Sequence, residues 1–414
     1  MNTGEINIGN YSQQGYSVLA REILTTSSSI TAIRRIDLAS FRNYSSLRID
    51  VGSSPVILTG ANGAGKTNLL EALSFLAPGR GLRRARLDEI AKRDNECEDS
   101  DWAIAVRLEK PTGEITIGSG INSQSQFSRT KKRIVQIDGK QASTQAELAK
   151  HFSIIWLTPE MDRIFLDGSS GRRRFLDRMA FGFSPEHAQR ISTYEQAMRA
   201  RQRLLRDNNY DPDWLSVLET TLAAEGVAIS ALRIEVIKRL NAVLNSSDFQ
   251  TGKSYFPIVD LELVGEVDRW LYEGPALAAE DRLKSVLFEA REEDRFSGRT
   301  NHGIHRSDLK VININKEMPA ALCSSGEQKL LLIAIILAHS YLLTLDYGLA
   351  PILLLDEITA HLDDKAREGL AFRILDLGLQ AWLTGSDENQ FTNFNGSAQF
   401  FKIEDGNISL ANGR

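Results

Sequence analysis

One short stretch of the chain combines glycines, a lysine and a hydroxyl at a spacing that binds phosphate. The stretch is GANGAGKTN, in which Gly60, Gly65, Lys66 and Thr67 complete the pattern G-x-x-x-x-G-K-[ST]. Glycines let backbone N–H groups approach phosphate oxygens, and the following helix adds its positive end. The lysine reaches the β- and γ-phosphates, and the hydroxyl joins a Mg²⁺ shell. We therefore expect ATP to contact Gly60, Ala61, Asn62, Gly63, Ala64, Gly65, Lys66, Thr67 and Asn68.

A second stretch supplies the acidic groups that such a site requires. PILLLDE ends in Asp356 and Glu357, after an apolar run typical of a strand buried on both faces of a parallel sheet. Ligands bind at the carboxyl ends of such strands. Asp356 is predicted to hold Mg²⁺ with Thr67, and Glu357 is the predicted catalytic group beside Lys66, orienting the attacking water. Either stretch alone could be an ordinary turn, but the pair favours a nucleotide site.

A helix start at SSGEQ forms a further predicted anion site. Ser325 and Gly326 precede two almost wholly apolar turns, so N–H groups and a serine hydroxyl are expected at one helix end. The alternative is a serine cap on a core helix. Because the glycine loop already has its own helix start, a second one suggests the phosphates of a second molecule. ABC-type ATPases, in which two subunits sandwich two ATP molecules, show the same pattern.

The elements that must position these residues follow from the apolar patterns. Strands are predicted over 31–58 and 101–140, an amphipathic helix after the glycine loop, and two helical arms over 184–245. The predicted fold class is α/β: an ABC-type P-loop ATPase head (lobe I, mixed sheet and helices) with an inserted, mostly helical lobe II. The predicted divisions are 1–30 for an N-terminal extension, 31–170 and 300–414 for the two halves of the head, and 171–299 for the inserted lobe.

The composition fits a soluble protein of two or three domains. The chain has 414 residues, 42% of them hydrophobic and 25% charged, and a net charge of −5, so nucleic-acid binding would have to come from local patches. Its two cysteines lack metal-ligand spacing. The most apolar run, 330–345, is shorter than the ~20 residues of a membrane span. These features predict a cytoplasmic location.

Clusters of arginine and lysine are the candidates for contact with DNA. Arg80, Arg83, Arg84 and Arg86 follow the predicted nucleotide helix and are favoured as DNA-facing. Solvated surfaces are the alternative for these and for the clusters at 129–133, 172–174 and 199–206. No base-reading motif is visible, so contact with the phosphate backbone is expected, without sequence preference.

With these motifs in order, the chain resembles the RecF family of bacterial DNA replication and repair proteins, a branch of the ABC- and SMC-like ATPases. The similarity spans about 31–405. SMC proteins carry a much longer coiled coil between the two half-sites, and no transporter coupling segment is recognisable. The stretches that carry the resemblance are LASFRNYSSLRIDV, GANGAGKTNLLEALSFLAPGRGLR, GRRRFLDRMAF, YEQAMRARQRLLRD, TNHGIHRSDL, SSGEQKLLLIAIILA, PILLLDEITAHLD and AWLTGSD.

The resemblance implies a slow ATPase whose ATP-bound heads form a homodimer on gapped DNA or on single-strand/double-strand junctions. It implies cooperation with RecR and RecO to load RecA, in recombination and the SOS response. Ser325, Gly326 and Gln328 would touch the nucleotide of the partner subunit, Asp363 would lie at the interface, and Arg42 and Asn43 would lie near the phosphates. Two features depart from transporter heads: Thr384-Gly385-Ser386-Asp387 stands where a switch histidine is expected, and WLTPEMDRIF offers no Q-loop glutamine.

Three other functions share parts of this pattern. A transporter-type subunit would associate with a membrane protein and ignore DNA. A head joined to a nuclease would need a second acidic cluster, and none is visible outside the ATP site. A module with an inactive nucleotide site is disfavoured by intact Lys66, Thr67, Asp356 and Glu357. His305 lies in a polar group that has no nucleophile or metal spacing, and we interpret it as structural.

Overall fold

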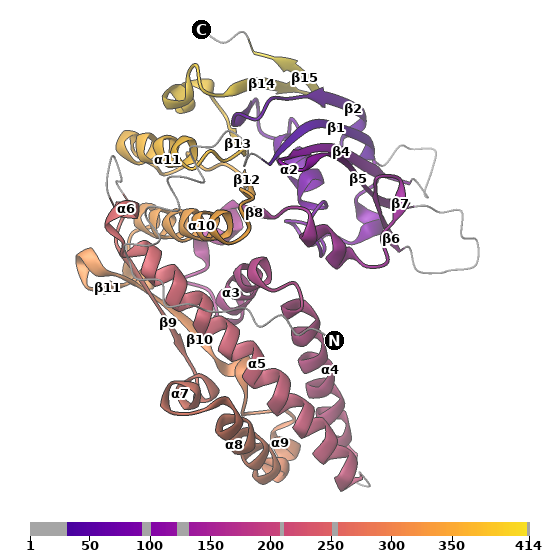
Figure 1. Ribbon diagram of the computed structural model, residues 1–414, viewed down its shortest axis with the longest axis vertical. Coiled ribbons are helices and arrows are strands. Elements are labelled where there is room, and N and C mark those ends of the chain that lie inside the picture. Colours follow the sequence, from indigo (N-terminus) through magenta and orange to yellow (C-terminus); the bar gives the residue numbers. More distant parts are fainter. Residues whose placement is uncertain (1–30, 93–100, 122–131, 208–210, 251–255, 412–414) are drawn as a thin grey trace. The chain divides into compact units, whose positions relative to one another are not determined.

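The computed structural model describes residues 31–92, 101–121, 132–207, 211–250 and 256–411. The chain divides into two compact units, drawn in Figure 1. Unit 1 takes Met1–Leu157, Asn245–Tyr255 and Ser340–Arg414, and unit 2 takes Thr158–Leu244 and Phe256–His339. Unit 2 thus begins before and ends after the inserted lobe expected at 171–299. The expected extension at 1–30 lies outside the described residues.

A six-stranded antiparallel sheet occupies the first part of unit 1. Its strand order is β2-β1-β4-β5-β6-β7, and neighbouring strands all pair in antiparallel register. The sequence predicted strands in both regions that form it. The bounds are β1 Ala32–Phe41, β2 Tyr44–Asp50, β4 Ala103–Lys110, β5 Gly113–Ile121, β6 Arg133–Ile137 and β7 Lys140–Gln141, with short 3-10 helices at Leu87–Glu89 and Gln145–Lys150.

A second six-stranded sheet carries the glycine loop. Its order is β15-β14-β3-β13-β12-β8, and all of its strand pairs are parallel except β14 with β15. Every residue of β3, β12 and β13 is buried, as expected for central parallel strands covered on both faces. The bounds are β3 Val56–Thr59, β8 Ile154–Leu157, β12 Ile352–Leu355, β13 Ala381–Gly385, β14 Gln399–Glu404 and β15 Asn407–Leu410.

Helix α2 (Lys66–Ser74) packs between the two sheets. Leu69 and Leu73 have no exposed surface, and their side chains join those of both sheets in one core. Gln380, also fully buried, ties the sheets together because its amide binds both main-chain groups of Ile33 and the carbonyl of Gly52. Helix α11 (Asp364–Asp376) lies on the other side of the parallel sheet (Figure 1).

Unit 2 is built from helices around a small sheet of order β11-β10-β9. The two long helices α4 and α5 confirm the predicted helical arms. The bounds are α3 Ser169–Phe183, α4 His187–Arg206, α5 Pro212–Leu244, α7 Glu266–Glu273, α8 Ala276–Glu289, α9 Arg291–Ser297, β9 Val259–Val264, β10 Asp308–Asn313 and β11 Met318–Pro319. The short helix α6, Ser247–Gln250, belongs to unit 1, and α10, Ser325–Tyr347, continues from unit 2 into unit 1.

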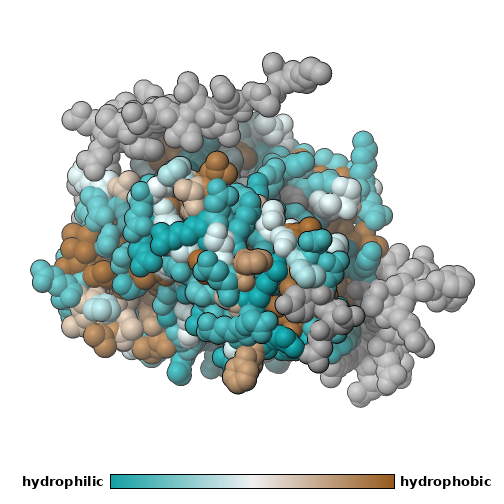
Figure 2. All heavy atoms as spheres, turned by 90° about the horizontal axis from the view of Figure 1, so that it is seen from below, coloured by the Kyte–Doolittle hydropathy of each residue, from teal (hydrophilic) through white to brown (hydrophobic). Residues whose placement is uncertain are grey.

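Two helices, α5 and α10, have the length and apolar composition of a membrane span. In α10 the composition has a plain structural cause, since the side chains from Leu331 to Ala338 are at most 2% exposed. The face shown in Figure 2 is mostly hydrophilic, and its apolar residues form separate patches. Core packing therefore accounts for the apolar run noted in the sequence.

A buried ion-pair network crosses the helices of unit 2. Arg201 has no exposed surface and binds Glu219 at 3.0 Å and Asp294 at 2.6 Å, while Arg291 also binds Glu219, at 2.6 Å. Arg201 therefore does not face DNA, which corrects the surface role considered for its basic cluster. Removing one partner from such a network leaves an uncompensated buried charge.

The Glu219→Gln variant should lose about 3–5 kcal/mol of unfolding free energy, because the buried Arg291 would lose its carboxylate and Arg201 would keep Asp294 alone. Urea denaturation followed by circular dichroism measures this loss. The matched control is Glu195→Gln, whose side chain is 52% exposed and pairs with Arg199 on the surface. Equal stability of the two variants would show that the buried network contributes nothing.

Candidate nucleotide site

The glycine loop connects β3 to α2, as the sequence predicted. Gly60, Gly63 and Gly65 have φ angles of 147°, 83° and 119°, in the region that favours glycine. A side chain at Gly60 would overlap the carbonyl of Ile403, so that position also needs glycine for space. Ala61, Asn62 and Gly63 are exposed, which leaves the outer part of the loop accessible to a ligand.

Lys66 lies folded over this loop. Its Nζ donates hydrogen bonds to the carbonyls of Gly60, at 2.7 Å, and Ala61, at 2.9 Å. Burial lowers the pKa of Lys66, and the charges of Glu357 and Asp356 oppose that effect. The lysine therefore lies beside both acidic residues predicted for the site, where phosphate oxygens can replace the two carbonyls as its acceptors.

The predicted metal ligands Thr67 and Asp356 lie next to each other. The Thr67 hydroxyl donates to Asp356 Oδ1 at 2.9 Å, although the two residues are 289 positions apart. A hydroxyl and one carboxylate are hard oxygen donors that suit Mg²⁺ when phosphates and water complete its shell. Among the described residues, no group of three or more His, Cys, Asp or Glu could hold a metal ion.

Thr384 organises the acidic pair, a role that no sequence motif predicted. Its hydroxyl donates to Asp356 Oδ1 at 2.7 Å and accepts the main-chain N–H of Glu357 at 2.8 Å. Parallel pairing of Leu355 with Leu383 brings the two strand ends together. In the sequence, Thr384-Gly385-Ser386-Asp387 stands where a transporter head has its switch histidine, but that comparison did not predict the contact of Thr384 with Asp356.

Glu357 has an exposed side chain and a φ of 47°. A positive φ is uncommon for a residue other than glycine, and such strain clusters at functional sites. The bond from its N–H to Thr384 helps to hold this conformation. The structure thus places the predicted water-orienting carboxylate at the end of β12, beside Asp356.

The turn between β1 and β2 holds the loop from the other side. The Asn43 side chain donates to the carbonyl of Ala64 at 3.1 Å, and the Tyr44 hydroxyl to that of Gly65 at 3.0 Å. Asn43 therefore lies against the loop, as predicted, and Tyr44 joins it although the sequence did not single it out. Burial raises the pKa of the Tyr44 hydroxyl, so it remains a donor.

Arg42 is committed to protein groups. Its Nε and Nη2 donate to the fully buried carboxylate of Glu71 at 2.9 and 2.6 Å, and its Nη1 to the carbonyl of Glu89 at 2.8 Å. All three guanidinium nitrogens are used. Arg42 thus supports α2 in this structure through protein acceptors, and its place near the phosphates stays a prediction.

The predicted signature residues lie in unit 2, at the start of α10. Ser325 is exposed and Gly326 half-buried. Ser324 and Glu327 form a reciprocal cap: Ser324 donates to the Glu327 carboxylate from N and Oγ, each at 2.9 Å. Lys316 and these bonds lower the pKa of Glu327 to about 2. The helix start is therefore rigid, with Ser325 accessible, as an anion site requires.

Gln328 and Asp363, also predicted for the dimer site, have partners within the chain. Gln328 is 3% exposed and donates to the carbonyl of Cys323 at 2.9 Å, so a contact with another subunit's nucleotide would require that bond to break. Asp363 is exposed and caps α11 by accepting the N–H of Ala366 at 2.8 Å. Only Asp363 is placed where a partner could reach it without rearrangement.

The four arginines favoured for DNA are all exposed, but their surroundings differ. Arg83 donates to Asn68 at 2.8 Å and to Glu71 at 3.1 Å, both on α2. Arg86 pairs with Asp88, and Arg84 has a φ of 53°. Arg83 is thus bonded to the nucleotide helix α2, and Arg80 is an exposed arginine of the same segment.

The other basic clusters are partly structural, which corrects their interpretation as open surfaces. Arg133 donates to the carbonyls of Phe75, Ala77 and Gly79, and burial lowers its pKa to about 10. Arg172 pairs with Asp308 at 2.7 Å. Arg129 and Lys131 lie outside the described residues.

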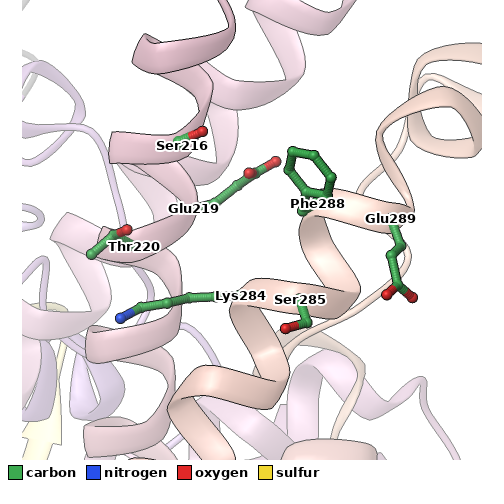
Figure 3. Close-up of a pocket in the computed structure, with 7 residues that line it drawn as sticks. All are labelled: Ser216, Glu219, Thr220, Lys284, Ser285, Phe288 and Glu289. Carbon is green, nitrogen blue, oxygen red and sulfur yellow. The ribbon is translucent and has the colours of Figure 1, made fainter.

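Two further features of unit 2 take no part in this site. His305 has both ring nitrogens engaged, with Tyr194 and with the carbonyl of Thr300, which matches its structural interpretation. A hollow of about 320 Å³ opens between α5 and α8. Figure 3 shows Glu219 and Phe288 facing each other across it, and Glu219 is already neutralised by Arg201 and Arg291.

Comparison with known proteins gives one consistent family. The RecF/RecN/SMC N-terminal domain matches residues 32–409. The DNA replication and repair protein RecF of Mesorhizobium japonicum is 43% identical over 378 residues, or 91% of this chain and 97% of that protein. RecF of Allorhizobium ampelinum is 42% identical over 381 residues, or 92% of this chain and 99% of that protein.

Solved structures show the same fold. The recombination mediator protein RecF with ATP, of the RecFOR pathway, has a TM-score of 0.78 at 21% identity, covering 94% of this chain and 99% of that one. The Smc head domain of Pyrococcus furiosus bound to ScpA has a TM-score of 0.52 at 17% identity, covering 92% and 96%. The fold is therefore the ABC-type ATPase head that the sequence predicted.

The Thr384→Val variant should hydrolyse ATP about tenfold to hundredfold more slowly, since Asp356 and the Glu357 backbone would both lose the hydroxyl that orients them. Phosphate release at saturating Mg-ATP measures the rate. The control is Thr344→Val, which removes another buried hydroxyl, one that donates to the Ser340 carbonyl of its own helix. If both variants retained the full rate, Thr384 would not position the acidic pair.

Proposed function

The chain belongs to the RecF/RecN/SMC N-terminal domain family, and from that premise we propose that it is a slow, DNA-linked ATPase of recombinational repair and replication. The observation that carries the proposal is the contact of Asp356 with the hydroxyls of Thr67 and Thr384, at 2.9 and 2.7 Å. It joins the two halves of a nucleotide site from distant parts of the chain. Relatives over 40% identical along nearly their whole length are named DNA replication and repair proteins.

The residues of the site divide the work of phosphate-bond cleavage. Loop N–H groups from Gly63 to Thr67 hold the phosphates, and Lys66 exchanges its two carbonyl acceptors for β- and γ-phosphate oxygens. Thr67 and Asp356 would hold Mg²⁺, which offsets negative charge on the phosphates when bound. Glu357, whose side chain is exposed directly after β12, orients the attacking water through its carboxylate.

A second copy of the chain completes each site in this proposal. Ser325 and Gly326 offer N–H groups and a hydroxyl at the start of a 23-residue helix, and Asp363 is exposed next to α11. Bound ATP would therefore lie between the loop of one subunit and the α10 start of the other. Nucleotide shifts the equilibrium towards the dimer only because it binds that state better, and hydrolysis reverses the shift.

DNA is the proposed partner of the dimer, at gaps or at single-strand/double-strand junctions. Arg80, Arg83, Arg84 and Arg86 form an exposed basic segment directly after the nucleotide helix, and arginines on phosphates give salt-sensitive binding without sequence preference. RecR, RecO and RecA are further proposed partners, and the cytoplasm the proposed location. RecR and RecO are supported by a fold neighbour described as a mediator in the RecFOR pathway, and RecA and the cytoplasm are what the resemblance to that family implies.

A transporter-type ATPase subunit is the alternative, and the comparisons do not favour it. The family match is to the RecF/RecN/SMC N-terminal domain, and the relatives are named DNA replication and repair proteins. In addition, the apolar helix α10 is explained by burial within the protein.

Light scattering tests the proposal directly. The Glu357→Gln variant, in which hydrolysis is blocked, should double in mass with Mg-ATP and keep a short DNA duplex bound. Adding Ser325→Arg should abolish the doubling, because the new side chain would fill the anion site. The matched control adds Ser285→Arg, another exposed serine of unit 2, and should dimerise normally. A protein that stays monomeric under all these conditions would contradict the two-subunit site.

A further inference from the structure

Three side chains connect the basic segment to the glycine loop. Arg83 Nη1 donates to Asn68 Oδ1 at 2.8 Å, Asn68 Nδ2 donates to Asn43 Oδ1 at 2.8 Å, and Asn43 Nδ2 donates to the Ala64 carbonyl at 3.1 Å. We call this chain of hydrogen bonds the Arg83 relay. Because every link lies in unit 1, the relay is a continuous path from a predicted DNA contact to the backbone that holds phosphate.

We propose that Asn68 is a positioning residue that holds Arg83 against α2 until nucleotide binds, so that ATP releases this arginine for a DNA phosphate. The inference rests on the proposed function, since it requires that the protein bind both ATP and DNA. It adds a route by which one ligand changes the affinity of the other.

At the loop end of the relay, Asn43 has little freedom to move independently. A Cβ added to Gly65 would lie 2.5 Å from Asn43 Nδ2 and 2.7 Å from the Tyr44 hydroxyl. The Ala64 carbonyl also accepts the N–H of Gly406, at 3.2 Å. Since the loop must adjust when phosphates replace the carbonyl acceptors of Lys66, a shift at Ala64 and Gly65 must displace Asn43 and, through it, Asn68.

At the other end of the relay, Arg83 can move away without leaving the buried carboxylate of Glu71 unpaired. Glu71 is fully buried, but Arg42 already binds both of its oxygens, so the 3.1 Å contact from Arg83 is an additional one. Two arginines facing one carboxylate also leave one net positive charge. Loss of the only partner of a buried carboxylate would be costly, whereas loss of a second partner is not.

Arg83 is also suited to receive a phosphate. Its side chain is 38% exposed, and within the described part of the chain its Nε and Nη2 have no hydrogen-bond partner. An arginine fork binds a phosphate through two parallel hydrogen bonds, which a neutral asparagine cannot match. In this proposal Asn68 and DNA compete for the position of the guanidinium, because the Asn68 bond to Nη1 holds the whole fork against α2. By linkage, ATP must raise DNA affinity by the factor by which DNA raises ATP affinity.

The first test measures binding of a fluorescent gapped duplex by anisotropy, without nucleotide. Asn68→Ala should bind the duplex about threefold to tenfold more tightly than the wild type, because Arg83 loses the hydrogen bond that retains it. ATP should then add correspondingly less affinity. Asn68→Asp should have the opposite effect without nucleotide, because a carboxylate holds Arg83 more strongly. A folding defect cannot produce effects of opposite sign.

A double-mutant cycle shows whether Arg83 carries the effect. Asn68→Ala should not change DNA affinity in an Arg83→Ala background, but should raise it as usual in an Arg80→Ala background, since Arg80 belongs to the same segment without a bond to α2. Unchanged or weaker DNA binding by Asn68→Ala, with normal DNA binding by the wild type, overturns the relay alone. A wild type that binds no DNA overturns the relay and the proposed function together.

Discussion

The carboxylate of Asp356 is the point on which the site depends. It lies at the end of a fully buried strand, and its Oδ1 accepts hydrogen bonds from Thr67, in the first turn of α2, and from Thr384, near the end of β13. Parallel pairing in the order β3-β13-β12 brings these strand ends to one edge of the sheet. The sheet register therefore assembles the site, and every other functional side chain is placed relative to that edge.

Much of this arrangement could be predicted from the sequence because it depends on local patterns. Residue types and their spacing predict the glycine loop. A continuous apolar run before Asp356 and Glu357 predicts β12. Both patterns reflect constraints within a few residues, namely a backbone that must approach phosphate and a strand covered on both faces. The α/β head and the two helical arms agree with the structure for the same reason, whereas the place of Asn43 beside the loop was implied by the family resemblance.

The rest depends on contacts between distant residues, which no local pattern records. Thr384 resembles any strand-end threonine until β13 pairs beside β12. Arg201 and Arg133 look like surface charges in the sequence, but one pairs with buried carboxylates and the other caps main-chain carbonyls. The same limit explains Gln328 and Arg42, whose polar groups are taken up by a carbonyl and a carboxylate of their own chain.

The arginines of this protein show why charge clusters alone predict function poorly. An arginine whose nitrogens all have acceptors, such as Arg42, is fixed, because moving it would leave the buried carboxylate of Glu71 without its main partner. An arginine without strong acceptors is always available to a phosphate, so its contact with DNA does not depend on bound nucleotide. Arg83 is intermediate: it shares a carboxylate that is already satisfied and an asparagine that is tied to the loop. Only such a partly satisfied cation can exchange a protein partner for DNA in response to nucleotide, because the free-energy difference between its two states is small.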